Sequence, residues 1–421
     1  MLVPLVKNRA GDLSSADNYR PIALCTVASK VMESILSHRL NDYLYVEDNQ
    51  FGFRKGLSTD MCIYTFKQII EYYTTHSSPS YICYIDSKKA FDRVNHWTLF
   101  SKLLKRGVPL YIVRILVHWY NTQQYSVLWC GIKSDLFTAP NGVKQGGILS
   151  PKLFAVYMDD LSIALNRLNV GSKLGGIRVN HLSFADDIAL IAPSAKGLQA
   201  ILSVCEKYAL DHDIVYNTSK TVCMLIRPKK LSNLKRVSLS LCGNELEFVE
   251  QYKYLGVLIS NVSSDNNDID RQRRALYRRA NMLFRKFHAC SVEVKQMLFQ
   301  TYCMNMYCAQ LWCNFTKKTM QKLRVAYNNC LRRFLGFPRF CSASGMFVSN
   351  NIRSFDEVIR KYIVSFRNRI EISANKLIKG INSTNLLLVS TFTFQSPTTT
   401  STDMRKALLV SEALIGEGTG L

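Results

Sequence analysis

The chain has no C-x-x-C pair, no long apolar run and comparatively few acidic residues, and each absence excludes a class of protein. Its thirteen cysteines are scattered, which argues against both a zinc-ribbon framework and a secreted disulfide scaffold. No apolar run reaches the roughly 18–20 residues that a bilayer-spanning helix needs. We therefore expect reduced thiols, no membrane partner, and an intracellular location in the nucleus, the cytoplasm or both.

The shortage of acidic residues dominates the composition. The 31 Asp and Glu residues stand against 54 Lys and Arg, so the 421-residue chain carries a formal net charge of +23. Such an excess favours a nucleic-acid partner, although a merely basic soluble protein would have the same composition. A hydrophobic content of 48% excludes wholesale disorder, and the length allows several structural units with cores of their own.

Hydrophobic periodicity predicts a chain that mixes helices with strands. The expected elements are helical structure over 29–40, 89–121 and 150–168, a hairpin over 127–139, and short strands over 81–85, 181–184 and 188–191. From about residue 266 the composition predicts a basic amphipathic helix. The region from about 383 to 402 is rich in Ser and Thr and predicts a loose tail.

Three aspartates stand where the expected strands end. Asp86 directly follows the run 81–85, and Asp186 and Asp187 are expected to form a turn between two β-prone runs. Nucleotidyl transfer needs two divalent ions about 4 Å apart, which hard oxygen ligands from neighbouring strands can hold. Because turns favour aspartate for conformational reasons alone, an Asp-Asp pair is weak evidence until its surroundings are considered.

Seven segments, in the same order, resemble sequence blocks of reverse transcriptases from non-LTR (LINE-like) retrotransposons. They are NYRPIAL (18–24), QFGFRKGLST (50–59), DSKKAFD (86–92), NGVKQGGILSP (141–151), FADD (184–187), NTSKT (217–221) and YLG (254–256). The resemblance implies an α+β right-hand polymerase. Its expected parts are fingers over 1–80, a palm with a small antiparallel sheet and part of the fingers over 81–265, a helical thumb and downstream region over 266–382, and a loose tail over 383–421.

The same resemblance implies an activity. An RNA-directed DNA polymerase would extend a primer 3′-hydroxyl with dNTPs, using two Mg²⁺ ions that Mn²⁺ could replace. Its partners would be an RNA template, a DNA primer and dNTPs, and the sequence leaves the oligomeric state open. Asp86 and Asp186 would ligate both metal ions and Asp187 would support them, so these three residues form the expected metal site.

The resemblance assigns further roles position by position. The Ser87 carbonyl could add a metal ligand, and Lys220 would protonate or steady the leaving pyrophosphate unless it is simply a surface lysine. Phe91, five positions after the first aspartate, would exclude a ribose 2′-hydroxyl, whereas without the family context it would be read as a core residue. Gln145 and Gly146 would lie at the nascent base pair, where a small residue lets the template backbone approach closely.

The remaining assignments concern contacts to the nucleotide and the nucleic acid. Expected triphosphate contacts are Lys7, Arg20 and Arg54, the expected primer grip is Tyr254, Leu255 and Gly256, and expected backbone contacts are Arg273, Arg274, Arg278 and Arg279. Plain surface positions are the alternative for the first three, and a solvated charged face is the alternative for the last four.

A second acidic pair, Asp159 and Asp160, follows Tyr157-Met158 and spells the retroviral form of the catalytic motif. The apolar residues around it recur at helical spacing, so this pair is expected on a helix, away from Asp86. We therefore place the catalytic pair at 186–187.

Two positions depart from the family pattern, in which Ser usually follows Gln-Gly and Pro commonly precedes it: the chain has Gly147 and Lys144 there. Neither change removes a metal ligand. The chain opens as if in mid-strand, with no endonuclease domain before the polymerase blocks and no Cys/His knuckle after them, so we expect a truncated product. Two rivals remain: a truncated or domesticated retroelement protein that binds RNA without catalysis, and an RNA-dependent RNA polymerase, which usually has an acid where this chain has Phe91, one position before Asp92.

Overall fold

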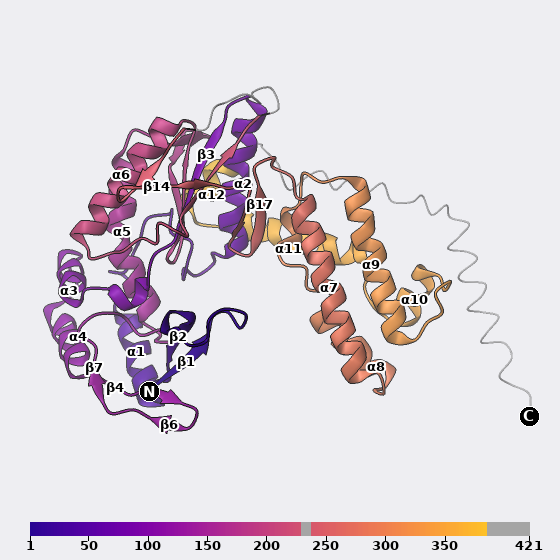
Figure 1. The fold of residues 1–421 in the computed structure, drawn as a ribbon, viewed down its shortest axis with the longest axis horizontal. Helices are drawn as coiled ribbons and strands as arrows, with labels where there is room; N and C mark the ends of the chain where they lie inside the picture. The colour runs from indigo at the N-terminus through magenta and orange to yellow at the C-terminus, as the bar shows by residue number, and fades with distance from the viewer. Residues whose placement is uncertain (229–236, 385–421) are drawn as a thin grey trace, which may run out of the picture.

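The computed structural model describes residues 1–228 and 237–384 as an α+β molecule (Figure 1). Its centre is a five-stranded sheet in the order β10-β11-β3-β12-β15. These strands are β3 (Ser80–Ile85), β10 (His181–Phe184), β11 (Asp187–Ala192), β12 (Val222–Ile226) and β15 (Glu247–Phe248). The first four pair antiparallel, and β15 joins β12 in parallel. The fold class and the largely antiparallel sheet expected from the sequence are confirmed.

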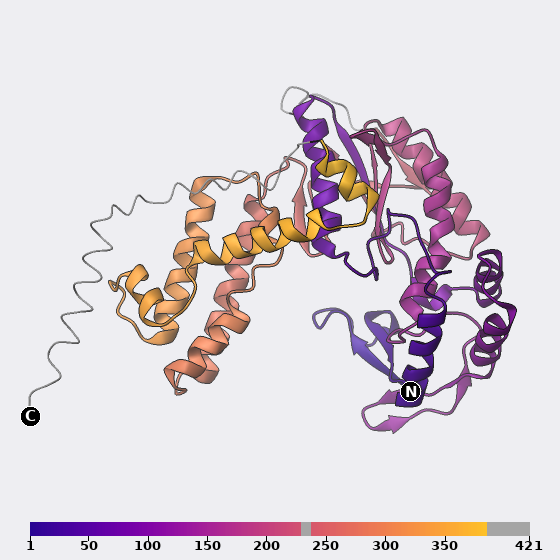
Figure 2. The ribbon, with the colours of Figure 1, turned by 180° about the vertical axis from the view of Figure 1, so that it is seen from behind.

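The central sheet is buried on both faces because its residues alternate between two apolar cores. Ile82 and Tyr84 of β3 belong to the core that contains helix α2 (Thr59–Thr75). Tyr81, Cys83 and Ile85 belong to the core formed with α5 (Ser150–Arg167) and α6 (Ala195–Asp211). Figures 1 and 2 show α2 on one side of the sheet and α5 and α6 on the other. Period-two alternation thus places a continuous apolar run between two helical layers.

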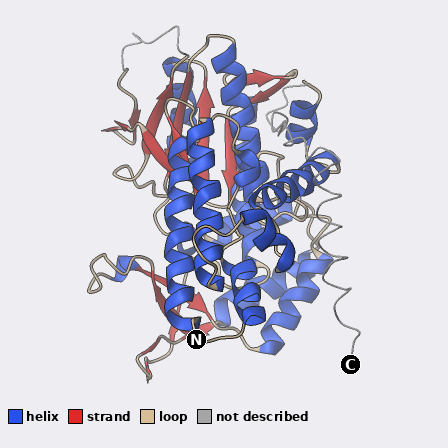
Figure 3. Ribbon diagram, turned by 90° about the vertical axis from the view of Figure 1, so that its right-hand side faces the viewer, coloured by secondary structure: helices blue, strands red, loops and turns tan. Residues whose placement is uncertain are grey.

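The N-terminal part and the region 124–138 contribute small strand pairs outside the central sheet. Strands β1 (Leu2–Val6) and β2 (Tyr19–Ala23) form a separate antiparallel pair, followed by α1 (Val27–Arg39). Figure 3 shows this small group of strands beside the N-terminus, apart from the central sheet. The predicted hairpin is present as nested pairs of two-residue strands: β4 (Gln124–Tyr125) with β7 (Phe137–Thr138), and β5 (Leu128–Trp129) with β6 (Ile132–Lys133).

Two helix expectations need correction. The region 89–121 is not one helix: a 3-10 turn (Ala90–Arg93) precedes α3 (His96–Lys105) and α4 (Leu110–Thr122). The break comes at Gly107, whose φ of +79° ends a helix, and at Pro109, which caps the next one. The helical spacing of the apolar residues in 29–40 predicts one shared face on α1, but that face is mostly open, since Val31 is 54% and Ile35 is 49% exposed.

The downstream part is helical, as expected. Its helices are α7 (Asn266–Phe287), α8 (Val292–Tyr302), α9 (Lys317–Leu335), α10 (Ala343–Ser349), α11 (Phe355–Glu371) and α12 (Lys376–Asn382). The apolar stripe of α7 is buried at Leu276, Ala280 and Leu283, and α7 packs along α9 (Figure 1). Helix α12 returns to α2 and to strand β9 (Ile177–Val179), as Figure 2 shows. The predicted tail lies outside the described residues from 385 onward.

The remaining short strands are β8 (Ser172–Leu174), which pairs with β9, and the hairpins β13 (Ser240–Leu241) with β14 (Asn244–Glu245) and β16 (Gln251–Tyr254) with β17 (Val257–Ser260). All thirteen cysteines are free thiols. Within the described parts of the chain, no helix has the length and apolar character to cross a bilayer.

Candidate active site

The three predicted catalytic aspartates meet at one end of the central sheet. Asp86 follows β3, whose last residue, Ile85, pairs with Ile188 of β11. One step further in this antiparallel register, Asp86 stands opposite Asp187. Because Phe184 pairs with Asp187, the two-residue turn between β10 and β11 consists of residues 185 and 186. The sequence expectation is corrected in one detail: Asp186 lies in the turn, but Asp187 begins β11.

The electrostatics of this end of the sheet show that the carboxylates repel one another. The pKa of Asp187 is raised to about 6, chiefly by loss of hydration and in addition by repulsion from Asp186 and Asp86. Loss of hydration also raises the pKa of Asp186. The Arg20 guanidinium opposes both shifts, which places its positive charge near the pair. Concentrated negative charge of this kind is what a divalent cation neutralises.

Within residues 1–228 and 237–384, no group of three or more His, Cys, Asp or Glu side chains is arranged around one point as a metal site. The donor chemistry nevertheless fits hard cations. Three carboxylates stand on adjoining strand ends, and carboxylate oxygens are the ligands that Mg²⁺ and Mn²⁺ favour.

The turn that carries Asp186 is held by residues for which the sequence reasoning had no role. The Gln50 side-chain oxygen accepts hydrogen bonds from the backbone N–H groups of Ala185 (2.9 Å) and Gly52 (2.8 Å). A Cβ on Gly52 would lie 2.4 Å from the Ala185 nitrogen, so only glycine fits this approach. Gln50 and Gly52 belong to the segment 50–59, which resembles a sequence block of the family, and this resemblance was the signal that could have pointed to them.

The end of β3 is held in a similar way by the segment 217–221. The Asn217 N–H donates to the Asp86 carbonyl at 2.8 Å, and the Asp86 N–H donates to the Thr221 hydroxyl at 3.2 Å. Ser87 forms an isolated bridge with Tyr216. Lys220 is an exposed residue of this same turn, so the fold brings it to the strand end that carries Asp86.

Phe91 and the Gln145–Gly146 pair lie close to this strand end, and each also serves the local packing. The half-buried Phe91 ring stacks on Phe154 at a centroid distance of 4.4 Å, which is the core contact considered above as the alternative. The Gln145 carbonyl accepts from the Ala23 N–H at 2.7 Å. A Cβ on Gly146, whose φ is +107°, would lie 3.0 Å from the Ala23 carbonyl. The small residue thus already accommodates a protein backbone, that of β2.

The three predicted triphosphate contacts differ in their surroundings. Arg20 is exposed and acts electrostatically on Asp186 and Asp187. Lys7 donates from Nζ to the Asp17 carbonyl at 2.9 Å. Arg54 is engaged within its own loop, where it pairs with Asp48 at 3.1 Å and donates to two carbonyls. Only Arg20 of these three is brought to the carboxylates by the interactions described.

The predicted primer grip is the turn of the β16–β17 hairpin. Tyr254 pairs with Val257, so the turn residues are Leu255 and Gly256, with φ values of +44° and +84°. Tyr254 is buried, whereas the turn is half-buried and contacts Tyr307, a residue that sequence reasoning missed. The Tyr307 hydroxyl donates to the Leu255 carbonyl at 2.9 Å, and a Cβ on Gly256 would lie 2.9 Å from its ring. No motif at residue 307 could have signalled this contact.

The four predicted backbone-binding arginines of α7 are not equivalent. Arg274 and Arg278 are exposed. Arg273 pairs with Asp270 at 3.0 Å, and Arg279 donates to the Asn305 carbonyl at 3.0 Å. The free face of the helix is therefore narrower than the sequence indicates.

The pair Asp159 and Asp160 lies on α5, as expected, and takes part in ion pairs. Arg106 pairs with Asp159 at 2.6 Å, and the Lys102 ammonium pairs with Asp160 at 2.5 Å. The Asp159 carboxylate also accepts from the Glu47 N–H at 2.7 Å. These contacts join α5 to α3 and to the loop before α2, and they give this pair a packing role.

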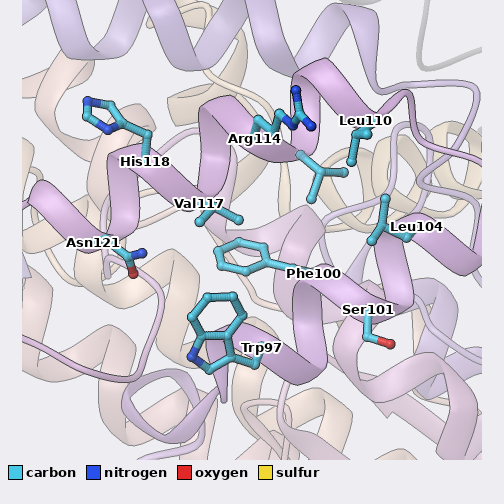
Figure 4. Close-up of a pocket in the computed structure, with 10 residues that line it drawn as sticks. Trp97, Phe100, Ser101, Leu104, Leu110, Arg114, Val117, His118 and Asn121 are labelled. Atoms are coloured by element: carbon cyan, nitrogen blue, oxygen red, sulfur yellow. The ribbon is translucent and has the colours of Figure 1, made fainter.

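A separate groove of about 550 Å³ lies between α3 and α4 (Figure 4). Its floor and walls are mostly apolar, with the side chains of Phe100, Leu104 and Val117 turned into it and Arg114 and His118 at the edge. None of the predicted site residues lines this groove, so it is not part of the candidate active site.

Residues 6–259 match the family described as reverse transcriptase (RNA-dependent DNA polymerase). The chain belongs to the reverse transcriptase family. Together with the mobile-element relatives, this match confirms the resemblance to reverse transcriptases of non-LTR retrotransposons.

Several curated relatives come from insect mobile elements. The probable RNA-directed DNA polymerase from transposon BS of Drosophila melanogaster is 26% identical over 373 residues, which cover 85% of this chain and 40% of the relative. The Pol polyprotein of the type-2 retrotransposable element R2DM, from the same species, is 31% identical over 249 residues, covering 57% of this chain and 23% of the relative. The chain thus spans two fifths or less of these relatives' length. Among solved structures, apo telomerase from Candida tropicalis aligns with 84% of this chain and 60% of its own, at 12% identity and a TM-score of 0.42.

Proposed function

We propose that the chain is the polymerase part of a retroelement RNA-directed DNA polymerase, which extends a primer 3′-hydroxyl with dNTPs on an RNA template. The observation that carries the proposal is the meeting of Asp86, Asp186 and Asp187 at the end of β3 and the β10–β11 turn. Membership of the reverse transcriptase family and the net charge of +23 support it.

In this proposal the three aspartates hold two divalent ions, with Asp86 and Asp186 as the shared ligands and the Ser87 carbonyl as a further one. When bound, such ions would lower the pKa of the primer hydroxyl and neutralise charge on the transferring phosphate. Arg20 adds positive charge beside the carboxylates and would meet the triphosphate. Lys220, in the turn attached to Asp86, would steady or protonate the leaving pyrophosphate.

The other proposed roles concern selection and grip. The half-buried Phe91 ring would meet the sugar and exclude a 2′-hydroxyl, and Gln145 and Gly146 would line the nascent base pair. The Leu255–Gly256 turn would contact the primer end. Arg274 and Arg278, which are exposed on α7, would bind backbone phosphates.

We also propose the division into fingers over 1–80, palm over 81–265 and a helical thumb with downstream region over 266–382. Two features support these boundaries. The central sheet begins with β3, and α7 begins the run of helices that follows the β16–β17 hairpin.

The test is primer extension on poly(rA)/oligo(dT) with Mg²⁺ and dTTP. The Asp186→Ala variant should lose synthesis while it retains RNA binding, because the change removes a proposed metal ligand and leaves the basic surfaces intact. Asp42→Ala, at an exposed position, is the matched control and should keep full activity. Unchanged synthesis by Asp186→Ala would refute the assignment.

The rivals give different results in the same assay. A wild-type chain that binds RNA but never extends a primer would be the non-catalytic retroelement protein. Incorporation of rNTPs in preference to dNTPs would indicate an RNA-dependent RNA polymerase. The variant Phe91→Ala should admit rNTPs if this ring excludes the 2′-hydroxyl.

A further inference from the structure

A buried carboxylate joins α1 to the loop that precedes α5. Glu33 of α1 is 4% exposed and Lys144 of the loop is 7% exposed. The Lys144 ammonium lies 3.4 Å from one Glu33 oxygen and 4.7 Å from the centroid of the Trp119 ring of α4. Burial strips both charged groups of their hydration. Removal of one partner therefore leaves the other charge buried and unpaired, which destabilises the fold.

The second oxygen of Glu33 caps a helix on a different element. It accepts hydrogen bonds from the backbone N–H groups of Ile148 and of Leu149, the latter at 3.3 Å. Leu149 is the N-cap residue of α5, and its own side chain makes no capping hydrogen bond. Glu33 therefore satisfies N–H groups at the start of α5 and places a negative charge at the positive end of its dipole.

Glu33 also approaches Gly147 closely. A Cβ on Gly147 would lie 3.1 Å from the capping oxygen of Glu33 and 2.6 Å from the Ser150 hydroxyl oxygen. The hydroxyl can rotate away, but the Glu33 carboxylate is held by Lys144 and by two N–H groups. A side chain at 147 would therefore press on the Glu33 carboxylate, and residues 144 and 147 both contact this one buried group.

We propose that Glu33, Lys144 and Gly147 form one buried unit that positions Gln145 and Gly146. Residues 144 and 147 flank this pair directly, so the unit holds both of its ends. Contacts of the pair with β2 complete the arrangement, since the Gln145 carbonyl accepts from the Ala23 N–H at 2.7 Å. The claim that the pair then meets the nascent base pair rests on the proposed function. Glu33 is a positioning residue because it acts only through this loop.

The unit is tested first without reference to activity. Glu33→Ala and Lys144→Met should each lower the Tm by at least about 5 °C. Glu33→Ala leaves the Lys144 charge and two N–H groups without a partner, and Lys144→Met leaves the Glu33 charge unpaired. The double variant Glu33→Gln, Lys144→Met should recover most of the loss, since glutamine keeps an acceptor for the cap and both charges are gone. Trypsin should cleave the bond after Lys144 in Glu33→Ala. The same bond should resist cleavage in the wild type, where Lys144 is buried.

The second test uses position 147. Gly147→Ser should lower the kcat/KM for dTTP by about tenfold in the wild-type background, chiefly through KM, and by less than about twofold when Glu33 is alanine. Affinity for the primer–template should stay unchanged in both. Gly345→Ser is the control, because the nearest atom to a Cβ there is 4.0 Å away.

The outcomes separate this inference from the proposed function. If the wild type does not extend primers, the proposed function fails, while the Tm values and the trypsin digestion still decide whether the unit exists. Equal effects of Gly147→Ser in the two backgrounds would overturn the proposal. So would a Glu33→Ala protein with wild-type Tm and wild-type resistance at Lys144.

Discussion

The approach of Gly52 to the catalytic turn makes a quantitative prediction. A Cβ at residue 52 would lie 2.4 Å from the Ala185 nitrogen, whereas ordinary contacts begin at 3.4 Å. In Gly52→Ala the two backbones must therefore separate by about 1 Å, the difference between these distances. The displacement falls on the turn next to Asp186, and a misplacement of this size in an aligned site costs on the order of 100-fold in rate.

The assay is steady-state primer extension with thermal unfolding measured in parallel. We expect Gly52→Ala to lose about two orders of magnitude in kcat and about 1–3 kcal/mol of stability through overpacking. Gly345→Ala, where a Cβ comes no closer than 4.0 Å to the Ser342 side chain, should change neither quantity. A Gly52→Ala enzyme with activity within twofold of wild type would show that Gly52 and Gln50 do not set the position of the turn.

Three further predictions follow from the site and the helical region. Because the pKa of Asp187 is raised to about 6 in the folded state, the folded protein binds more protons than the unfolded chain between about pH 4 and 6, so this group lowers stability as the pH rises through that window. In EDTA, Asp187→Asn should therefore unfold at a higher temperature than wild type above pH 6, and the gain should vanish near pH 4. Tyr307→Phe removes the 2.9 Å hydrogen bond to the Leu255 carbonyl and should raise the KM for primer–template by about fivefold, as roughly 1 kcal/mol predicts. Trp312→Phe leaves a buried Asp268 oxygen without its 2.9 Å donor and should cost about 1–3 kcal/mol in urea unfolding.

Two of these predictions have a defined contrary result, and the third has a matched control. A Tm difference for Asp187→Asn that does not change between pH 4 and 8 would mean that Asp187 has an ordinary pKa. A Tyr307→Phe enzyme that loses kcat and keeps its KM would place Tyr307 outside primer binding. Trp97→Phe, at an exposed tryptophan, is the control for Trp312→Phe and should leave the unfolding free energy unchanged.

Local patterns carried much of the information about this site. An apolar run that ends on Asp86, and a short turn between two β-forming runs, identified the strand ends that meet in the sheet. Helical spacing around Asp159 correctly removed it from that site, because an i, i+3, i+4 pattern is a property of neighbouring residues. Period also marked the buried stripe of α7.

The contacts that hold the site were decided by the tertiary fold. Gln50 with Ala185, Glu33 with Ile148, and Tyr307 with Leu255 join residues 135, 115 and 52 positions apart, and their partners depend on how whole elements pack. A short pattern of side chains can report its own helix or strand, because that geometry repeats over a few residues. It cannot report a hydrogen bond to another element, or a glycine that another element approaches too closely for a Cβ. For this reason the roles of Gly52, Gly147 and Glu33 emerged only from the packed structure.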